Sequence, residues 1–275
     1  MSLRINNNIA ALNSYRNLSA TNVQMGKSLE KLSSGFRINR AADDAAGLVK
    51  SENLRSEIRG TSGAIKNAQD GISFVQTAEG ALNEVHSILQ RMRELAVDSA
   101  NTATTDGTAQ NEEVQELLAE LDAIGSRTTF AGNTVFGDFS SAALTFQVGS
   151  GASDQLAVTT DLTLSSGDVF SIDLSAIDLT SASGATAAMT ALDNAIGSVS
   201  SIRSELGATQ NRLEHTVNNL SVALENLTAS ESRIRDTDMA MEMAAFTRHQ
   251  ILSQAGTSML AQANQAPQNV LSLLR

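Results

Sequence analysis

The sequence predicts a mainly α fold, in which the N- and C-terminal arms form a long antiparallel helical hairpin or coiled-coil bundle with a small central β-hairpin region. The chain has 275 residues, one proline and 3% aromatic residues. Long helices can therefore run uninterrupted and pack through small aliphatic side chains. Hydrophobic residues recur at helical spacing toward both ends. Between residues 133 and 184 the charged helix formers nearly vanish, and Ser, Thr and Gly increase.

The first helix is expected between Ile5 and Phe36, where apolar residues follow a helical period. Because Ser33, Ser34 and Gly35 interrupt this period, we expect the helix to end there. Its last apolar positions are spaced by four, three and four residues, as in a coiled-coil seam. These positions are Met25, Leu29, Leu32 and Phe36.

A second helical region is expected to begin near Asp43. An apolar stripe with gaps of seven, or of three and four, runs from Ile58 to Met92, which is roughly 50 Å of helix at 1.5 Å per residue. Few globular helices reach that length without a helical partner. Residues 101–107 (NTATTDG) predict a turn, and a third helix should end before Gly132.

Short alternating apolar runs, such as Leu144, Phe146 and Val148, predict small β-strands or hairpins in the centre. Helix returns near Ala187, and a last helical segment starts at about Asp238. Neither helical arm can bury its apolar stripe alone, so the two arms should pair.

The composition excludes several classes of function. The net charge of -11 argues against a nucleic-acid-binding protein, and no apolar run is long enough to span a membrane. There is no Cys, and the start of the chain lacks the features of a cleaved secretory signal. His86, His215 and His249 lie apart, and no catalytic motif is present. We therefore predict no catalytic residues, no bound metal and no cofactor, and interpret Asp43 and Asp44 as charges at a helix N-terminus.

Several strings resemble bacterial flagellins. Residues 32–48, LSSGFRINRAADDAAGL, are similar to the N-terminal signature of that family, and residues 250–275, QILSQAGTSMLAQANQAPQNVLSLLR, are similar to its C-terminus almost residue for residue. Further similar strings are residues 67–85, 89–101 and 205–220. The resemblance covers about residues 1–135 and 190–275 and leaves out the centre.

The resemblance implies a structural subunit, not an enzyme, that self-assembles into the extracellular flagellar filament used for motility. It implies three parts: an inner terminal coiled-coil domain, a helical rod domain and a central β-hairpin part of the rod. It also implies export of the unfolded chain through the flagellar type III channel, and as partners an export chaperone, hook-junction proteins and a cap. The three parts correspond to residues 1–44 with 232–275, 45–135 with 188–231, and 136–187.

The ends of the chain carry more large apolar side chains than one hairpin can bury. We therefore expect neighbouring subunits to cover them, and we expect the ends to be frayed in the monomer and to order on polymerisation. The predicted assembly residues are Ile5, Ile9, Leu12, Leu252, Met259, Leu260, Val270 and Leu273.

A second surface follows from the resemblance alone. In many flagellins a host Toll-like receptor contacts the rod around a string similar to residues 90–101. The corresponding residues here are Gln90, Arg91, Leu95 and Glu113. The alternative interpretation is that these residues only pack between neighbouring subunits.

Other classes remain as alternatives. A hook–filament junction protein would share the terminal helices but act in few copies, and would resemble flagellin more loosely. A type III needle component would lack the rod strings. A binding module would need a rigid aromatic patch, and an enzyme inserted in the centre would need a motif such as HExxH.

Overall fold

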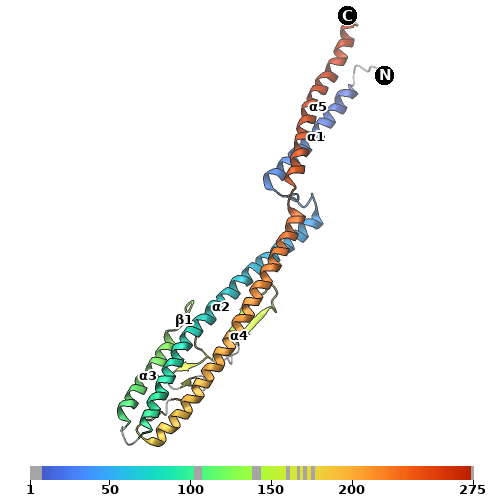
Figure 1. Ribbon diagram of the computed structural model, residues 1–275. Coiled ribbons are helices and arrows are strands. Elements are labelled where there is room, and N and C mark those ends of the chain that lie inside the picture. The colour runs from blue at the N-terminus through green and yellow to red at the C-terminus, as the bar shows by residue number, and fades with distance from the viewer. Residues whose placement is uncertain are drawn as a thin grey trace. The chain divides into compact units, whose positions relative to one another are not determined.

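The computed structural model describes residues 8–101, 107–137, 144–158, 162–165, 168–169, 172–174 and 177–273. It confirms the mainly α fold, with long helices that pack against one another and small antiparallel hairpins (Figure 1). The helices of the described part are α1 (Ile9–Ser34), α2 (Ala45–Ser99), α3 (Thr108–Arg127), α4 (Ala182–Arg235) and α5 (Met239–Leu273).

The ends of α1 show why this helix starts and stops where it does. The Asn8 side chain accepts a hydrogen bond from the backbone N–H of Ala11 at 3.1 Å, which satisfies a donor that no helical carbonyl can reach. Gly35 follows the helix with φ of 76°, a left-handed conformation that glycine adopts without a steric penalty. The predicted end of the first helix is therefore confirmed.

The chain divides into two compact units, which we describe separately. The terminal unit comprises Met1–Glu57 and Asn226–Arg275, and the central unit comprises Ile58–Glu225. These boundaries come from the packing of the chain, and the three-part division made from the sequence stays a prediction.

The central unit has an extensive hydrophobic core between α2, α3 and α4. Leu89 and Met92 of α2, Leu121 of α3 and Leu192 of α4 are fully buried in one cluster. The apolar stripe predicted on the second helix faces this core from Val75 to Met92, whereas Ile58 and Ile65 are only partly buried and lie outside it. Packing of the stripe against α3 and α4 stabilises this part of so long a helix.

Three small hairpins add to the central unit. The strands β1 (Thr129–Phe130) and β2 (Asn133–Thr134) are joined by Ala131 and Gly132, both with positive φ, as in the tight turns that match strand twist. The Phe74 ring of α2 contacts the rings of Phe130 and Phe146, each at 6.0 Å between centroids. These rings anchor two hairpins on α2. The other strands are β3 (Leu144–Gln147) paired with β4 (Gln155–Val158) and β5 (Leu164–Ser165) paired with β6 (Asp168–Val169).

In the terminal unit α1 and α5 run antiparallel, side by side (Figure 1). Polar contacts join them along their length. These are Asn8 to the Ala263 carbonyl at 2.7 Å, Ser253 to Asn22 at 3.0 Å, and Lys31 to Glu242 at 3.7 Å.

The side of α1 that packs on α5 differs from the predicted seam. Its less exposed positions are spaced by three and four residues, as the sequence predicted, but small and polar residues occupy many of them. Ser28 is buried, whereas Leu29 is 57% exposed. The seam prediction was therefore wrong at Leu29, because small residues let the two helices approach closely and the large apolar residue turns outward. The partly or fully buried positions include Leu18, Thr21, Met25, Ser28 and Leu32.

Candidate assembly surface

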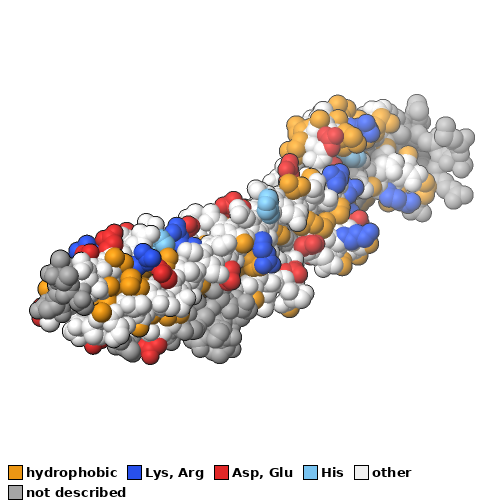
Figure 2. All heavy atoms as spheres, turned by 60° about the horizontal axis from the view of Figure 1, so that its bottom comes forward, with side chains coloured by type: hydrophobic (Ala, Val, Ile, Leu, Met, Phe, Trp, Pro, Cys, Tyr) orange, Lys and Arg blue, Asp and Glu red, His pale blue; other side chains and the backbone are white. Residues whose placement is uncertain are grey.

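The exposed hydrophobic side chains of the described residues concentrate on the terminal helices. Eleven of the fourteen large ones that are exposed lie on α1 or α5. Figure 2 shows such side chains gathered over these helices on the visible face. They are Ile9, Leu12, Tyr15, Val23 and Leu29 on α1, and Met239, Met241, Met243, Ile251, Leu252 and Met259 on α5.

The same unit has almost no core of its own. Among the described residues, Ile38 is the one hydrophobic side chain of the terminal unit that is buried, whereas the other buried hydrophobic side chains lie in the central unit. An apolar surface without a core beneath it is an interaction surface rather than the outside of a stable domain.

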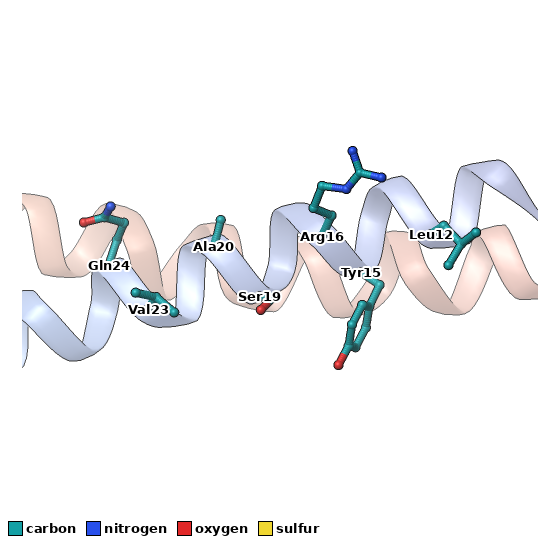
Figure 3. Close-up of a pocket in the computed structure, with 7 residues that line it drawn as sticks. All are labelled: Leu12, Tyr15, Arg16, Ser19, Ala20, Val23 and Gln24. Atoms are coloured by element: carbon teal, nitrogen blue, oxygen red, sulfur yellow. The ribbon is translucent and has the colours of Figure 1, made fainter.

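Two shallow grooves lie in this surface. The first, of about 580 Å³, is lined by residues of α1 alone, among them Leu12, Tyr15, Arg16 and Val23. In Figure 3, Tyr15 and Val23 point to one side of the helix and Arg16 points to the other. The lining thus combines apolar side chains with the polar side chains of Arg16, Ser19 and Gln24.

The second groove, of about 320 Å³, lies between α1 and α5. Leu18 lines it from α1, and Leu252, Gly256 and Met259 line it from α5. A side chain at position 256 would meet Leu18 at 3.1 Å, so the glycine keeps the helices close while its larger neighbours stay outside.

The predicted assembly residues are placed as follows. Ile9 is 58% exposed, Leu12 56%, Leu252 48% and Met259 62%, so these four are available to a neighbouring subunit. Leu260 is only partly exposed, on the side of α5 that faces α1. Ile5 lies outside the described residues, as do the side chains of Val270 and Leu273. The roles of all eight residues in assembly stay predictions.

Sequence reasoning missed several residues of this surface. Tyr15, Val23 and Ile251 are exposed by 57% or more, although hydrophobic spacing alone gave no reason to separate them from seam positions. The signal that could have identified them is the width of the apolar surface around each helix. Apolar residues that cover more than one face of a helix indicate more than one partner.

A compact joint connects the terminal helices to α2 and α4. Residues 35–37 and 235–237 pair across it, with Arg37 N–H donating to the Arg235 carbonyl at 2.6 Å and Thr237 N–H donating to the Gly35 carbonyl at 2.9 Å. Backbone hydrogen bonds therefore join the two breaks between helices.

The Arg235 side chain closes this joint. Its guanidinium lies 4.9 Å from the centroid of the Phe36 ring and donates to Glu52 Oε1 at 2.6 Å. The side chain is only 13% exposed. The hydrogen bond from Arg235 holds the pKa of Glu52 below its ordinary value.

Two neighbouring carboxylates fix the rest of the joint. Asp44 accepts from Gly47 N–H at 2.9 Å in the first turn of α2. Asp43 accepts from the N–H groups of Arg40 and Asn39 at 3.0 and 3.3 Å, and these bonds lower the pKa of Asp43, that from Arg40 most. Both acidic residues therefore bond to backbone donors.

The residues of the predicted receptor contact fall into two groups. Arg91 bonds to Glu113 of α3 at 2.8 and 2.9 Å, which raises the pKa of Arg91, and Gln90 bonds to His86 at 3.0 Å. Gln90, Arg91 and Glu113 are exposed. Leu95, in contrast, is 4% exposed and belongs to the core, so it supports the surface from below and offers little of itself to a partner.

The described residues hold no group of three or more acidic or histidine side chains arranged to bind a metal ion. None of the helices described is long and apolar enough to cross a membrane. Long paired helices with an exposed apolar terminal unit are typical of a structural subunit that assembles with copies of itself.

Comparison with known proteins identifies this class further. Residues 5–140 match the bacterial flagellin N-terminal helical region, and residues 189–274 match the bacterial flagellin C-terminal helical region. A flagellin of Bacillus subtilis is 49% identical over 99% of this chain and 100% of that protein. A flagellin of Halalkalibacterium halodurans is 52% identical over 98% and 99%. The chain belongs to the bacterial flagellin family, and it is a structural subunit of the extracellular flagellar filament.

A solved structure shows the same fold at low identity. A putative flagellar hook-associated protein from Vibrio parahaemolyticus has a TM-score of 0.55 and 15% identity, over 70% of this chain and 100% of that chain. At that identity the likeness concerns the fold alone.

Proposed function

We propose that subunits of this chain join through the exposed apolar side chains of α1 and α5, and that neighbouring subunits supply the core that the terminal unit lacks. One observation carries this proposal. Most of the exposed large hydrophobic side chains are on these two helices, and Ile38 is the one buried hydrophobic side chain in the described part of their unit.

The energies are of the right size for a cooperative polymer. Covering a side chain that is about half exposed contributes about 1 kcal/mol, so eleven such side chains contribute on the order of 10 kcal/mol. Association costs between about 4 and 15 kcal/mol. A contact that covers only part of this surface is therefore weak, and a subunit stays bound when several neighbours cover it together.

We further propose the layered arrangement of the family for this chain. Residues 1–44 with 232–275 form the inner domain, 45–135 with 188–231 form the rod, and 136–187 form the β-hairpin part of the rod. The outward position of large apolar side chains on α1 and α5 supports this proposal, because it leaves them for the walls of the filament core.

The chain is exported unfolded through the flagellar type III channel. An export chaperone holds the C-terminal segment, a cap covers the folding subunit, and hook-junction proteins bind the first subunits. The absence of Cys supports passage as an unfolded chain, because no thiol can mispair on the way. The chain needs no catalytic activity for any of these steps.

A host Toll-like receptor contacts the rod at Gln90, Arg91 and Glu113, with Leu95 packed beneath them. The exposed Arg91–Glu113 pair offers both charges at one place. Arg91→Ala should lower receptor signalling in a reporter-cell assay, whereas Arg203→Ala, which removes a similar ion pair with Glu79, should leave it unchanged. Equal signalling by both variants would contradict this contact.

The assembly proposal is tested by a matched pair of substitutions. Val23 on α1 is 57% exposed and Val222 on α4 is 58% exposed, so Val23→Ser and Val222→Ser alter the same residue type at the same exposure. Polymerisation is induced with sulfate, which strengthens apolar burial, and is followed by sedimentation and negative-stain electron microscopy. We expect Val23→Ser to raise the critical concentration several-fold and Val222→Ser to leave it near the wild-type value.

Equal critical concentrations for the two variants would refute a role for the α1 surface. Short closed oligomers of the wild-type chain under every condition, in place of long filaments, would favour the junction-protein alternative.

A further inference from the structure

The methionines of this chain are unevenly distributed. The sequence has eight, and four of them lie on α5. All four are exposed: Met239 by 48%, Met241 by 73%, Met243 by 50% and Met259 by 62%. In contrast, Met92 of α2 is fully buried in the core of the central unit. The exposed methionine side chains of the described residues thus lie on α5.

Two of these methionines belong to the surface that other subunits cover. Met241, Leu252 and Met259 are spaced by 11 and 7 residues, which is close to three and two helical turns, so they lie on one face of α5. Met259 and Leu252 also line the groove between α1 and α5. A polar group introduced on this face would be placed among apolar side chains in the polymer.

Methionine is also the side chain of this protein that reacts most readily with a peroxide. The chain has no Cys and no Trp, and only one Tyr. In the reaction, the thioether sulfur takes one oxygen atom from hydrogen peroxide, the O–O bond breaks and water leaves. The sulfur loses two electrons and the peroxide gains them. The product, a sulfoxide, is polar, and it disrupts interfaces rich in methionine.

We infer that the exposed methionines of α5 form an oxidation site that decides whether a free subunit can join the polymer. The inference rests on the assembly surface proposed above. A peroxide converts these thioethers to sulfoxides in the free subunit, and the oxidised face of α5 no longer packs against neighbours. Within the polymer, neighbours cover the same sulfur atoms and protect them. Methionine sulfoxide reductases reverse the change.

The test begins with the purified full-length monomer treated with hydrogen peroxide, and with preformed filaments treated in the same way. Mass spectrometry of peptides gives the extent of oxidation at each methionine. We expect Met241 and Met259 to oxidise first in the monomer, Met92 last, and the α5 positions to be protected in filaments. Sulfate-induced polymerisation of the oxidised monomer should need a several-fold higher critical concentration.

Two controls assign the effect to α5. A variant with leucine at positions 239, 241, 243 and 259 keeps apolar side chains of similar volume and helix propensity. The critical concentration of this variant should be the same before and after peroxide treatment, whatever its value relative to the wild-type chain. Treatment of the oxidised wild-type chain with both stereospecific reductases and dithiothreitol should restore polymerisation, and the reductant acts on nothing else because the chain has no disulfide.

Oxidised wild-type monomer that polymerises as well as untreated monomer would overturn the inference, as would an equal loss in the leucine variant. These outcomes differ from a failure of the assembly proposal, which would appear as an unaltered critical concentration of Val23→Ser without any oxidant.

Discussion

Replacement of Arg235 by glutamine should open the joint between residues 35–37 and 235–237, which lies within the terminal unit. Glutamine has no charge, and its side chain is too short to place a flat cation on Phe36. Loss of the arginine side chain leaves the backbone hydrogen bonds of Arg37 and Thr237 without the contact between Arg235 and Phe36 that covers them.

The magnitude follows from the geometry of the guanidinium. A cation over an aromatic ring contributes about 0.5–1 kcal/mol at an exposed site and about 2 kcal/mol when desolvated, and Arg235 is only 13% exposed. Its ion pair with the half-exposed Glu52 is screened by solvent, so the contact with Phe36 dominates. A loss of about 1–2 kcal/mol makes local opening about 5–30 times more frequent.

Hydrogen exchange measures this opening directly. The amide protons of Arg37 and Thr237 should exchange faster in Arg235→Gln by that factor, and Arg235→Lys should give an intermediate rate because it keeps the charge but loses the planar stack. Arg233→Gln is the matched control, since Arg233 lies in the same helical turn and bonds only locally, to Ser230. Wild-type exchange at both amides in Arg235→Gln would refute the reasoning.

Three further predictions concern stability. Leu89→Ala should lower the free energy of unfolding of the central unit by about 2–5 kcal/mol, because Leu89 is fully buried; Val222→Ala should change it by less than about 0.5 kcal/mol, and equal urea midpoints would contradict this. Gly107→Ala should destabilise the fold by at least about 1–2 kcal/mol, because φ is 73° and a Cβ would clash with the Leu179 carbonyl. Gly197→Ala has open space around the added Cβ and should stabilise the fold. In thermal melting, the first variant should lower the melting temperature and the second should raise it. The pKa of Asp43 is lowered on folding. The ionised carboxylate therefore contributes to the stability of the folded state above its unfolded pKa, and this contribution is lost as pH falls through the folded pKa, below about 4. Protection of the Arg40 amide, corrected for intrinsic exchange, should fall in that range, and Asp43→Asn should remove this dependence.

Helix positions were predictable where hydrophobic periodicity and capping residues agree. The end of α1 at Gly35 and the start of α5 at Met239 were both within reach, because a glycine and an aspartate mark them. The start of α4 was not predictable. It begins at Ala182, five residues before the predicted position, because Ser181 accepts from Gly184 N–H at 3.2 Å. The composition of that segment is typical of a loop, and only the capping geometry makes it helical.

The exposed apolar surface of α1 and α5 was predictable in its location but not in all its members. Leu12, Leu252 and Met259 follow from an excess of apolar side chains at both ends. The outward position of Leu29 does not, because hydrophobic spacing assumes that the largest apolar residues form the seam, and here Ser28 takes that place. Leu95 shows the reverse case. A string resembling a receptor contact contains a residue that serves the core, and sequence similarity cannot separate these roles.

The near-absence of a core in the terminal unit has a thermodynamic consequence. A unit that completes its apolar contacts with other subunits is stabilised by mass action, and its melting temperature rises with subunit concentration. The central unit carries its own core, and its melting temperature is set by the chain alone. The stability of the central unit is thus independent of subunit concentration. The stability of the terminal unit depends on how many other subunits are present to cover it.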